Sequence, residues 1–181
     1  MKRIFIDMDG VLAEYRKDCN ETDLTRKGYF LSLKPEDNML KAVEMLINSA
    51  DDLGFSVHVL TKVYPNMFKY SVDEKLQWRD EHMPYLYDSE FIMVNGEKSE
   101  KSQAVKEVLN TEIDESCILV DDYNSNLFEW SSKGGTSVKF VNSINDINHS
   151  FIGNRISYDM SAFEIYQKLI GIISMVGSRV A

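Results

Sequence analysis

The sequence predicts an α/β fold in which a Rossmann-like parallel sheet carries helices on both faces. Short β-rich apolar runs alternate with stretches of helical periodicity, and the connections between them are short, which is typical of parallel sheets. Four of the five expected strands are followed at once by polar residues suited to phosphate or metal chemistry. Because open parallel sheets bind ligands at the carboxyl ends of their strands, this pattern also predicts where a site lies.

Two strands and two helices are expected in the first half of the chain. Residues 4–6 form a β-rich run that ends in an acidic turn. Apolar residues then recur at helical spacing from 35 to 53, and Gly54 ends this helix. The second strand covers 55–60, and a helix fits 72–82.

The second half continues the alternation with three more strands and three more helices. We expect strands at 91–94, 116–120 and 137–141, and helices at 101–109, 127–132 and 161–175. On the helix at 72–82, the charged runs Asp73-Glu74-Lys75 and Arg79-Asp80-Glu81 are expected to form a solvated face. Trp78 and Trp130 are interpreted as packing residues.

One segment interrupts the alternation. Residues 13–33 lie between the first strand and the first helix and are longer than an ordinary connection of this kind. They carry Tyr15, Tyr29 and Phe30 among charged residues. We expect residues 1–181 to form a single domain in which residues 13–33 are a small inserted cap over the strand ends; the alternative is a surface loop.

Composition excludes several classes of protein. Apolar residues make up 44% of the 181 residues and aromatic residues 11%, so the chain as a whole is not disordered. The net charge of −9 argues against a nucleic-acid partner, which needs a basic surface. No apolar run reaches the length of a membrane span. Two cysteines are too few for a disulfide framework, and a cytoplasmic location is expected.

Two acidic residues follow the first strand directly. In the run Asp7-Met8-Asp9-Gly10 the two carboxylates stand one residue apart on the same turn. One carboxylate can attack phosphorus and bind a cation, while the other gives and takes a proton. Gly10 permits a tight turn whose amide groups face an anion. An acidic turn without chemistry is the alternative for this motif taken alone.

The other strand ends add complementary groups. Thr61 supplies a hydroxyl, and Lys101 opens a helix, where a cation is unfavourable unless an anion holds it; Lys98 competes for that role. Asp121 and Asp122 follow a buried strand, and their mutual repulsion calls for a cation. Oxygen ligands of this kind suit Mg²⁺, and the direct ligand is Asp121 or Asp122, with Asp121 slightly favoured.

These elements together resemble a known family. The run from Asp7 to Ala13 is similar to the first motif of the haloacid dehalogenase-like phosphatase superfamily, and in particular to its 5′(3′)-deoxyribonucleotidase branch. Thr61, Lys101 and the pair Asp121-Asp122 match its second, third and fourth motifs. The resemblance runs from residue 1 to about 142, although the segment 13–33 is shorter than the four-helix cap of the mammalian members.

The resemblance implies two-step phosphoryl transfer. Asp7 would be the nucleophile that forms an aspartyl-phosphate, and Asp9 the general acid and base. Mg²⁺ would be held by the Asp7 carboxylate, the Asp9 carbonyl and a carboxylate of the pair Asp121-Asp122. Thr61 and Lys101 would bind the phosphoryl oxygens.

The expected substrate is a small phosphomonoester. Tyr15 falls where the deoxyribonucleotidases place an aromatic contact to the base, which indicates a 5′-nucleotidase acting on nucleoside monophosphates, with deoxyribonucleotides preferred and a broad base preference. The alternative is a phosphatase acting on sugar phosphates, because residues 13–33 also carry many charges. Two non-enzymatic alternatives are a receiver-like signalling domain and an interaction protein. A receiver needs an aspartate after its third strand, where this chain has Asn95-Gly96. The oligomeric state is not predicted.

Overall fold

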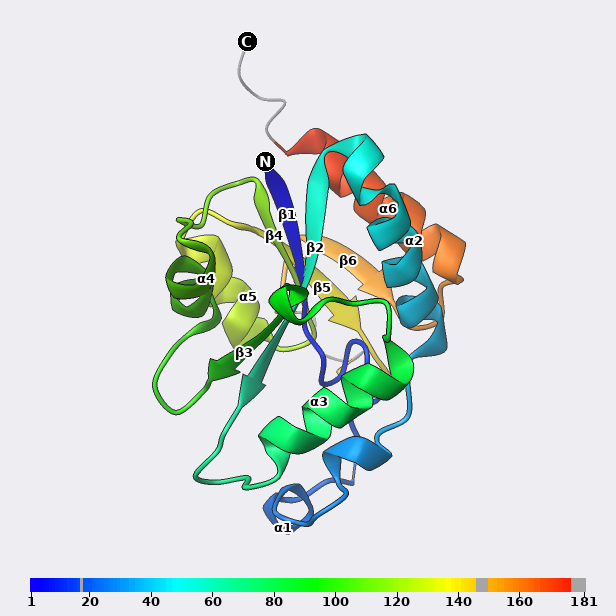
Figure 1. The fold of residues 1–181 in the computed structure, drawn as a ribbon. Helices are drawn as coiled ribbons and strands as arrows, with labels where there is room; N and C mark the ends of the chain where they lie inside the picture. The colour runs from blue at the N-terminus through cyan, green and yellow to red at the C-terminus, as the bar shows by residue number, and fades with distance from the viewer. Residues whose placement is uncertain (17, 146–149, 177–181) are drawn as a thin grey trace.

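The computed structural model describes residues 1–16, 18–145 and 150–176. Within these residues six strands form one sheet in the order β3-β2-β1-β4-β5-β6, and every pair of neighbours is parallel (Figure 1). The strands are β1 (Lys2–Ile6), β2 (Phe55–Val63), β3 (Phe91–Asn95), β4 (Cys117–Asp121), β5 (Thr136–Val141) and β6 (Asn154–Ser157). The predicted α/β class is therefore confirmed.

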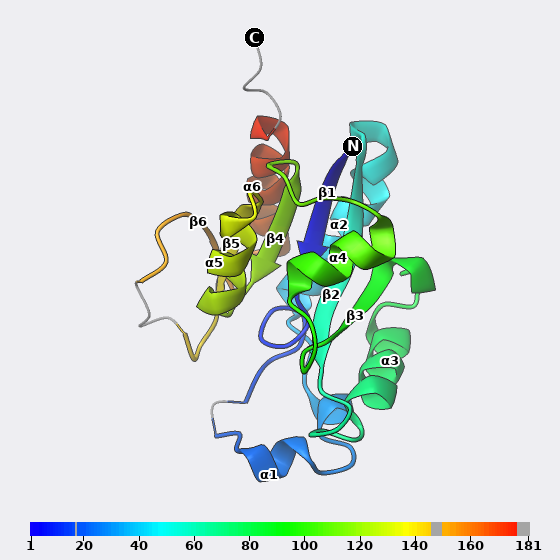
Figure 2. The same ribbon diagram turned by 90° about the vertical axis from the view of Figure 1, so that its left-hand side faces the viewer.

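Helices cover both faces of the sheet. In Figure 1, α2 and α6 lie on one side and α4 and α5 on the other, while α1 and α3 lie toward the end where the strand arrows point, as Figure 2 also shows. The helices are α1 (Glu21–Leu24), α2 (Asp37–Leu53), α3 (Ser71–His82), α4 (Lys101–Leu109), α5 (Asn124–Ser132) and α6 (Ala162–Met175), with 3₁₀ turns at Phe30–Ser32 and Asp88–Glu90. None of the helices within the described residues is both long and apolar enough to cross a bilayer.

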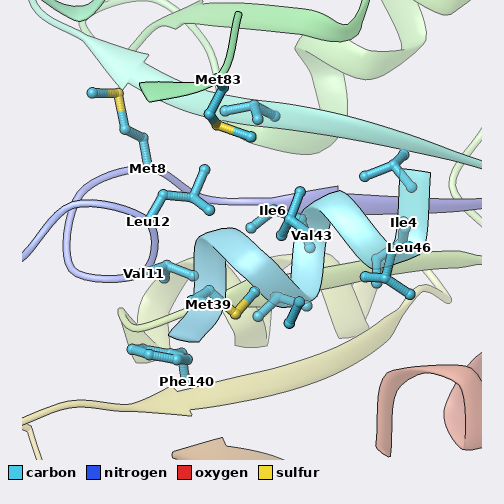
Figure 3. Packing of buried hydrophobic residues seen from close by; sticks show 14 of the residues in the cluster. Ile4, Ile6, Met8, Val11, Leu12, Met39, Val43, Leu46, Met83 and Phe140 are labelled. Carbon is cyan, nitrogen blue, oxygen red and sulfur yellow. The ribbon is translucent and has the colours of Figure 1, made fainter. Parts of the chain in front are cut away.

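Helix α2 illustrates why the predicted elements form. Its buried residues Met39, Val43 and Leu46 recur three or four positions apart, so one face of the helix packs on the sheet. Figure 3 shows these side chains beside Ile6 of β1. Complete burial of each such side chain contributes about 1.5–3 kcal/mol.

Strand β6 is absent from the prediction, which placed five strands. Its residues pair in parallel with β5 at the edge of the sheet, with Ile156 opposite Phe140. Only Ile156 is buried in the strand, so the sequence lacks the apolar alternation that identifies a strand. Strand β2 differs as well, because it continues to Val63 and Thr61 lies inside it.

The insertion, residues 13–33, leaves and re-enters the fold at one place. Ala13 forms an isolated bridge with Pro35, and the Glu14 amide donates to the Lys34 carbonyl at 2.7 Å. Tyr29 and Phe30 are buried, so its second half packs into the core as well as facing the strand ends.

Candidate active site

A cavity of about 360 Å³ opens at the carboxyl ends of the strands. Five of the seven residues predicted for the site line it: Asp7, Asp9, Tyr15, Lys101 and Asp122. The other two, Thr61 and Asp121, are fully buried. The cavity is also lined by apolar and aromatic residues of the insertion and of the loop after β2, which include Leu24, Phe30, Tyr64 and Phe68, and by further residues that include Lys75 and Asn126.

The loop after β1 carries the first two acids into this cavity. Its apolar residues Met8 and Leu12 are fully buried; Figure 3 shows Leu12 beside α2 and the Met8 side chain pointing away from this helix, on the side of Met83. These contacts anchor the loop in the core. Gly10 has a φ of +79°, a region that other residues rarely adopt. A side chain at Gly10 would also collide with the Asp122 carboxylate, so this turn admits glycine alone.

Three carboxylates converge next to one buried lysine. Ligand oxygens of Asp7, Asp121 and Asp122 lie within 4.8 Å of one another. The Lys101 ammonium is 2.7 Å from Asp7 Oδ1 and 2.6 Å from Asp121 Oδ2, and its residue is 1% exposed. Lys98, its competitor in the sequence, is exposed.

Burial and crowding raise the pKa values of two of these acids. Burial raises the pKa of Asp7 to about 8; Lys101 acts against the rise, and Asp121 adds to it. Burial also raises the pKa of Asp122 to about 7, again with a contribution from Asp121. For Lys101 burial alone would lower the pKa, but Asp121 and Asp7 raise it. When all three carboxylates are ionised, they carry more negative charge than Lys101 offsets, and a divalent cation would neutralise the excess.

The paired acids Asp121 and Asp122 have different surroundings. Both oxygens of Asp121 accept hydrogen bonds: Oδ1 from the Tyr123 amide at 2.8 Å, and Oδ2 from Lys101 and from Asn126 at 3.0 Å. Asp122 lines the cavity, and its Oδ2 accepts from Asn142 at 2.9 Å. Asp121 thus fixes Lys101, and Asp122 presents its carboxylate to the cavity.

Several residues that hold Asp122 in place were not predicted from the sequence. Asn142 also donates to the Gly10 carbonyl at 2.9 Å, which ties the first acidic loop to the last. The Asp122 carbonyl accepts from the buried Lys139 and from Asn145 at 3.1 Å. Lys139 lies in β5 and the two asparagines follow this strand, and no motif in the sequence marks them.

Lys75 is the second lysine of the site, and the prediction for it was wrong. Residues 73–75 were expected on a solvated face, but Glu74 is 5% exposed and Lys75 is 1% exposed. The Lys75 ammonium pairs with Asp9 Oδ2 and donates to Thr61 Oγ1 at 2.8 Å. One signal was available in the sequence: Trp78 lies three positions after Lys75 and four after Glu74, so all three share a helix face.

The prediction for Arg79 was wrong as well, because this residue of the second charged run is buried, whereas the predictions for the two tryptophans hold. Trp78 and Trp130 are 1% and 0% exposed, and both act as packing residues whose indole groups donate to carbonyls, of Leu33 at 2.8 Å and of Cys117 at 3.0 Å. Tyr15 is half-buried against the cavity, where burial and the nearby Cys19 raise the pKa of its hydroxyl.

Comparisons with known proteins identify the fold. No protein-family model matches the sequence, and no curated protein matches it. The solved D,D-heptose 1,7-bisphosphate phosphatase of B. bronchiseptica, complexed with magnesium and phosphate, matches with a TM-score of 0.67 at 11% identity, over 94% of this chain and 99% of that chain.

Two further structures agree with this match. The D,D-heptose 1,7-bisphosphate phosphatase of Burkholderia thailandensis has a TM-score of 0.58 at 11% identity, over 95% of this chain and 99% of that chain. A HAD hydrolase of family IA, variant 3, from Entamoeba histolytica has a TM-score of 0.57 at 13% identity, over 96% and 100%. The chain therefore has the α/β fold of the haloacid dehalogenase-like phosphatases.

Proposed function

We propose that this protein is a Mg²⁺-dependent phosphatase that hydrolyses small phosphomonoesters through an aspartyl-phosphate on Asp7. One observation carries the proposal: Asp7, Asp9, Lys101 and Asp122 line one cavity at the carboxyl ends of a parallel sheet. The fold neighbours are phosphatases by name, which supports the same class of reaction.

The proposed reaction has two steps. First, a carboxylate oxygen of Asp7 bonds to phosphorus while the ester P–O bond breaks, and Asp9 gives its proton to the leaving oxygen. Then the oxygen of a water molecule bonds to phosphorus, Asp9 takes the proton of that water, and the bond between Asp7 and phosphorus breaks. Asp9 ends the cycle in the protonation state in which it began.

Lys101 and Thr61 are proposed to bind the phosphoryl oxygens. Lys101 donates to Asp7 and Asp121, which leaves one N–H of its ammonium for the substrate. Its charge lies beside the nucleophile, where it offsets the repulsion between a carboxylate and a phosphate. Thr61 is linked to the site by Lys75, whose ammonium donates a hydrogen bond to the Thr61 hydroxyl.

The donor set fits Mg²⁺. Asp7 and Asp122 would hold the ion by their carboxylates and Asp9 by its carbonyl; Asp122 is preferred to Asp121 because both Asp121 oxygens already accept hydrogen bonds. When bound, the ion would neutralise charge at the phosphoryl group and favour the ionised, nucleophilic form of Asp7.

The proposed substrate is a deoxynucleoside monophosphate. Tyr15, Phe30, Tyr64 and Phe68 give the cavity an aromatic wall, with Tyr64 and Phe68 in edge contact at 5.7 Å. Aromatic faces stack on nucleobases with about 1–3 kcal/mol per base. The insertion would then act as the cap over the site. The expected location of the protein is the cytoplasm. Sugar phosphates are the second candidate, because two fold neighbours are heptose bisphosphate phosphatases.

A substrate comparison tests both levels of the proposal. We would measure kcat/KM for dUMP, dTMP, dGMP, several sugar phosphates and p-nitrophenyl phosphate, with Mg²⁺ and with a chelator, using Asp7→Asn as the inactive control. Tyr15→Ala should lower kcat/KM for the nucleotides by about 5- to 150-fold, as the stacking energy implies, and spare p-nitrophenyl phosphate. Tyr15→Phe should retain the wild-type ratio.

The outcomes separate the two levels. A wild-type protein that prefers sugar phosphates by tenfold or more contradicts the nucleotidase proposal but leaves the phosphatase proposal intact. If Asp7→Asn retains wild-type turnover, the proposed mechanism is wrong.

A further inference from the structure

Lys75 is buried among acceptors that use its whole ammonium group. The side chain is 1% exposed, and Nζ pairs with Asp9 Oδ2 and donates to Thr61 Oγ1 at 2.8 Å and to the Lys62 carbonyl at 2.7 Å. An ammonium has three N–H donors, and the three contacts account for all of them. Lys75 therefore acts as a fixed strut between β2 and the loop after β1.

The contact with Lys75 gives the two carboxylate oxygens of Asp9 different hydrogen-bonding surroundings. Oδ2 is occupied by Lys75, whereas Oδ1 is buried and has no hydrogen-bond partner within the described part of the chain. A buried carboxylate oxygen without a partner costs free energy. The arrangement is thus incomplete until another atom meets Oδ1, and Asp9 lines the cavity where such an atom would arrive.

Helix α3 holds Lys75 in place from the other side. Glu74 accepts hydrogen bonds from the Gly28 amide at 2.5 Å and from the Phe30 amide at 3.1 Å. The Phe30 ring centre is also 5.3 Å from Lys75 Nζ, within the range of a cation–π contact. The insertion and α3 therefore fix the lysine before any substrate binds.

We propose that Lys75 is a positioning residue that holds Asp9 by Oδ2 and so assigns proton transfer to Oδ1. The proposal rests on the proposed phosphatase function. In the first step the proton on Oδ1 passes to the leaving oxygen as the P–O bond breaks; in the second step Oδ1 takes a proton from the attacking water. Lys75 also lines the cavity, but all three of its N–H donors are used by protein acceptors, so in this proposal it neither exchanges a proton nor binds the phosphoryl group.

The dependence of rate on the leaving group tests this role. Phenyl phosphate and p-nitrophenyl phosphate have similar shapes, but phenolate is the poorer leaving group and needs the proton of Asp9 more. Lys75→Met should lower kcat/KM for phenyl phosphate at least tenfold more than for p-nitrophenyl phosphate, since general acid catalysis contributes about 10²–10⁴. Lys106→Met, on an exposed part of α4, is the matched control and should leave both rates unchanged.

A double-mutant cycle shows whether Lys75 acts through Asp9. In an Asp9→Asn background, Lys75→Met should change kcat/KM less than about twofold, because the group it positions is already lost. If the methionine variant does not fold, Lys75→Gln carries the same test: its amide donates to Thr61 but brings no charge to Asp9.

Two results would overturn the proposal. Equal losses on both phosphates, or a full additional loss in the Asp9→Asn background, mean that Lys75 contacts the phosphoryl group or supports the fold alone. A wild-type protein that hydrolyses neither phosphate contradicts the proposed function instead, so the two failures are distinguishable.

Discussion

Lys101 and Lys98 differ by three positions in sequence and completely in environment. Lys101 opens α4 with its ammonium between Asp7 and Asp121, whereas Lys98 is exposed. A positive charge at the first residue of a helix is unfavourable, because the helix dipole is positive there. The charge of Lys101 is tolerated because two buried carboxylates surround it. Removing one partner from such a group leaves the others buried and unpaired.

At this scale we predict that Lys101→Met costs far more than Lys98→Met. Loss of the Lys101 charge should reduce kcat/KM by 100-fold or more and lower the free energy of unfolding by about 3–5 kcal/mol. Lys98→Met should stay within about 0.5 kcal/mol of the wild type. Kinetics and urea denaturation measure the two effects, and the reverse ranking would assign the role to Lys98.

Helix α3 is the element that joins the insertion to the site. Glu74 holds two amides of the insertion, Trp78 donates to the Leu33 carbonyl at 2.8 Å, and Lys75 reaches Asp9. These residues lie on one face of the helix. The position of the insertion and the geometry of Asp9 are thus set by the same short stretch of chain.

We therefore predict that Glu74→Gln loosens the insertion. An amide accepts with one oxygen only, so its NH2 group faces one of the two backbone donors and that bond is lost; the free energy of unfolding should fall by about 1.5–3 kcal/mol. Trypsin should cleave faster after the exposed Arg26 or Lys27. The exposed neighbour Asp73 provides the control: cleavage rates that are equal in Glu74→Gln and Asp73→Asn would contradict the tether.

For the whole molecule, the buried acids make stability depend on pH and on the cation. The pKa values of Asp7 and Asp122, raised to about 8 and about 7, lie above the usual carboxyl range. The folded state then holds protons that the unfolded chain releases, so stability is present at low pH and is lost as pH rises through these values. His58 has the opposite dependence below about pH 6.5, because burial lowers its pKa to about 4.

With a chelator, we expect the free energy of unfolding to fall by about 2 kcal/mol between pH 6.5 and pH 8, because the half-protonated His58 of the unfolded chain offsets only about 0.4 kcal/mol of the change. Excess Mg²⁺ should reverse the loss at pH 8, because a ligand that binds only the folded state stabilises it. Asp122→Asn should flatten the pH dependence and weaken the response to Mg²⁺. A chelated wild type with constant stability across this range would contradict the prediction.

The sequence by itself determined the fold class, because the alternation of apolar periods reports which segments are strands and which are helices. It also marked Asp7, Asp9 and Asp122, since residues that directly follow buried strands of a parallel sheet meet at one edge, and Lys101, which opens the helix after β3. Local patterns carry this information. Strand β6 lay outside it, because an edge strand with one buried residue has no such pattern.

Only the tertiary structure decided how the charges are paired. Lys75 stands in a run of charged residues that resembles any solvated helix face, and its partner Asp9 lies 66 positions away. The same holds for Asn142, which is 132 positions from Gly10. The sequence does not distinguish a charged residue that is buried from one that is exposed. The partner that makes burial of the charge tolerable comes near it only when the chain folds.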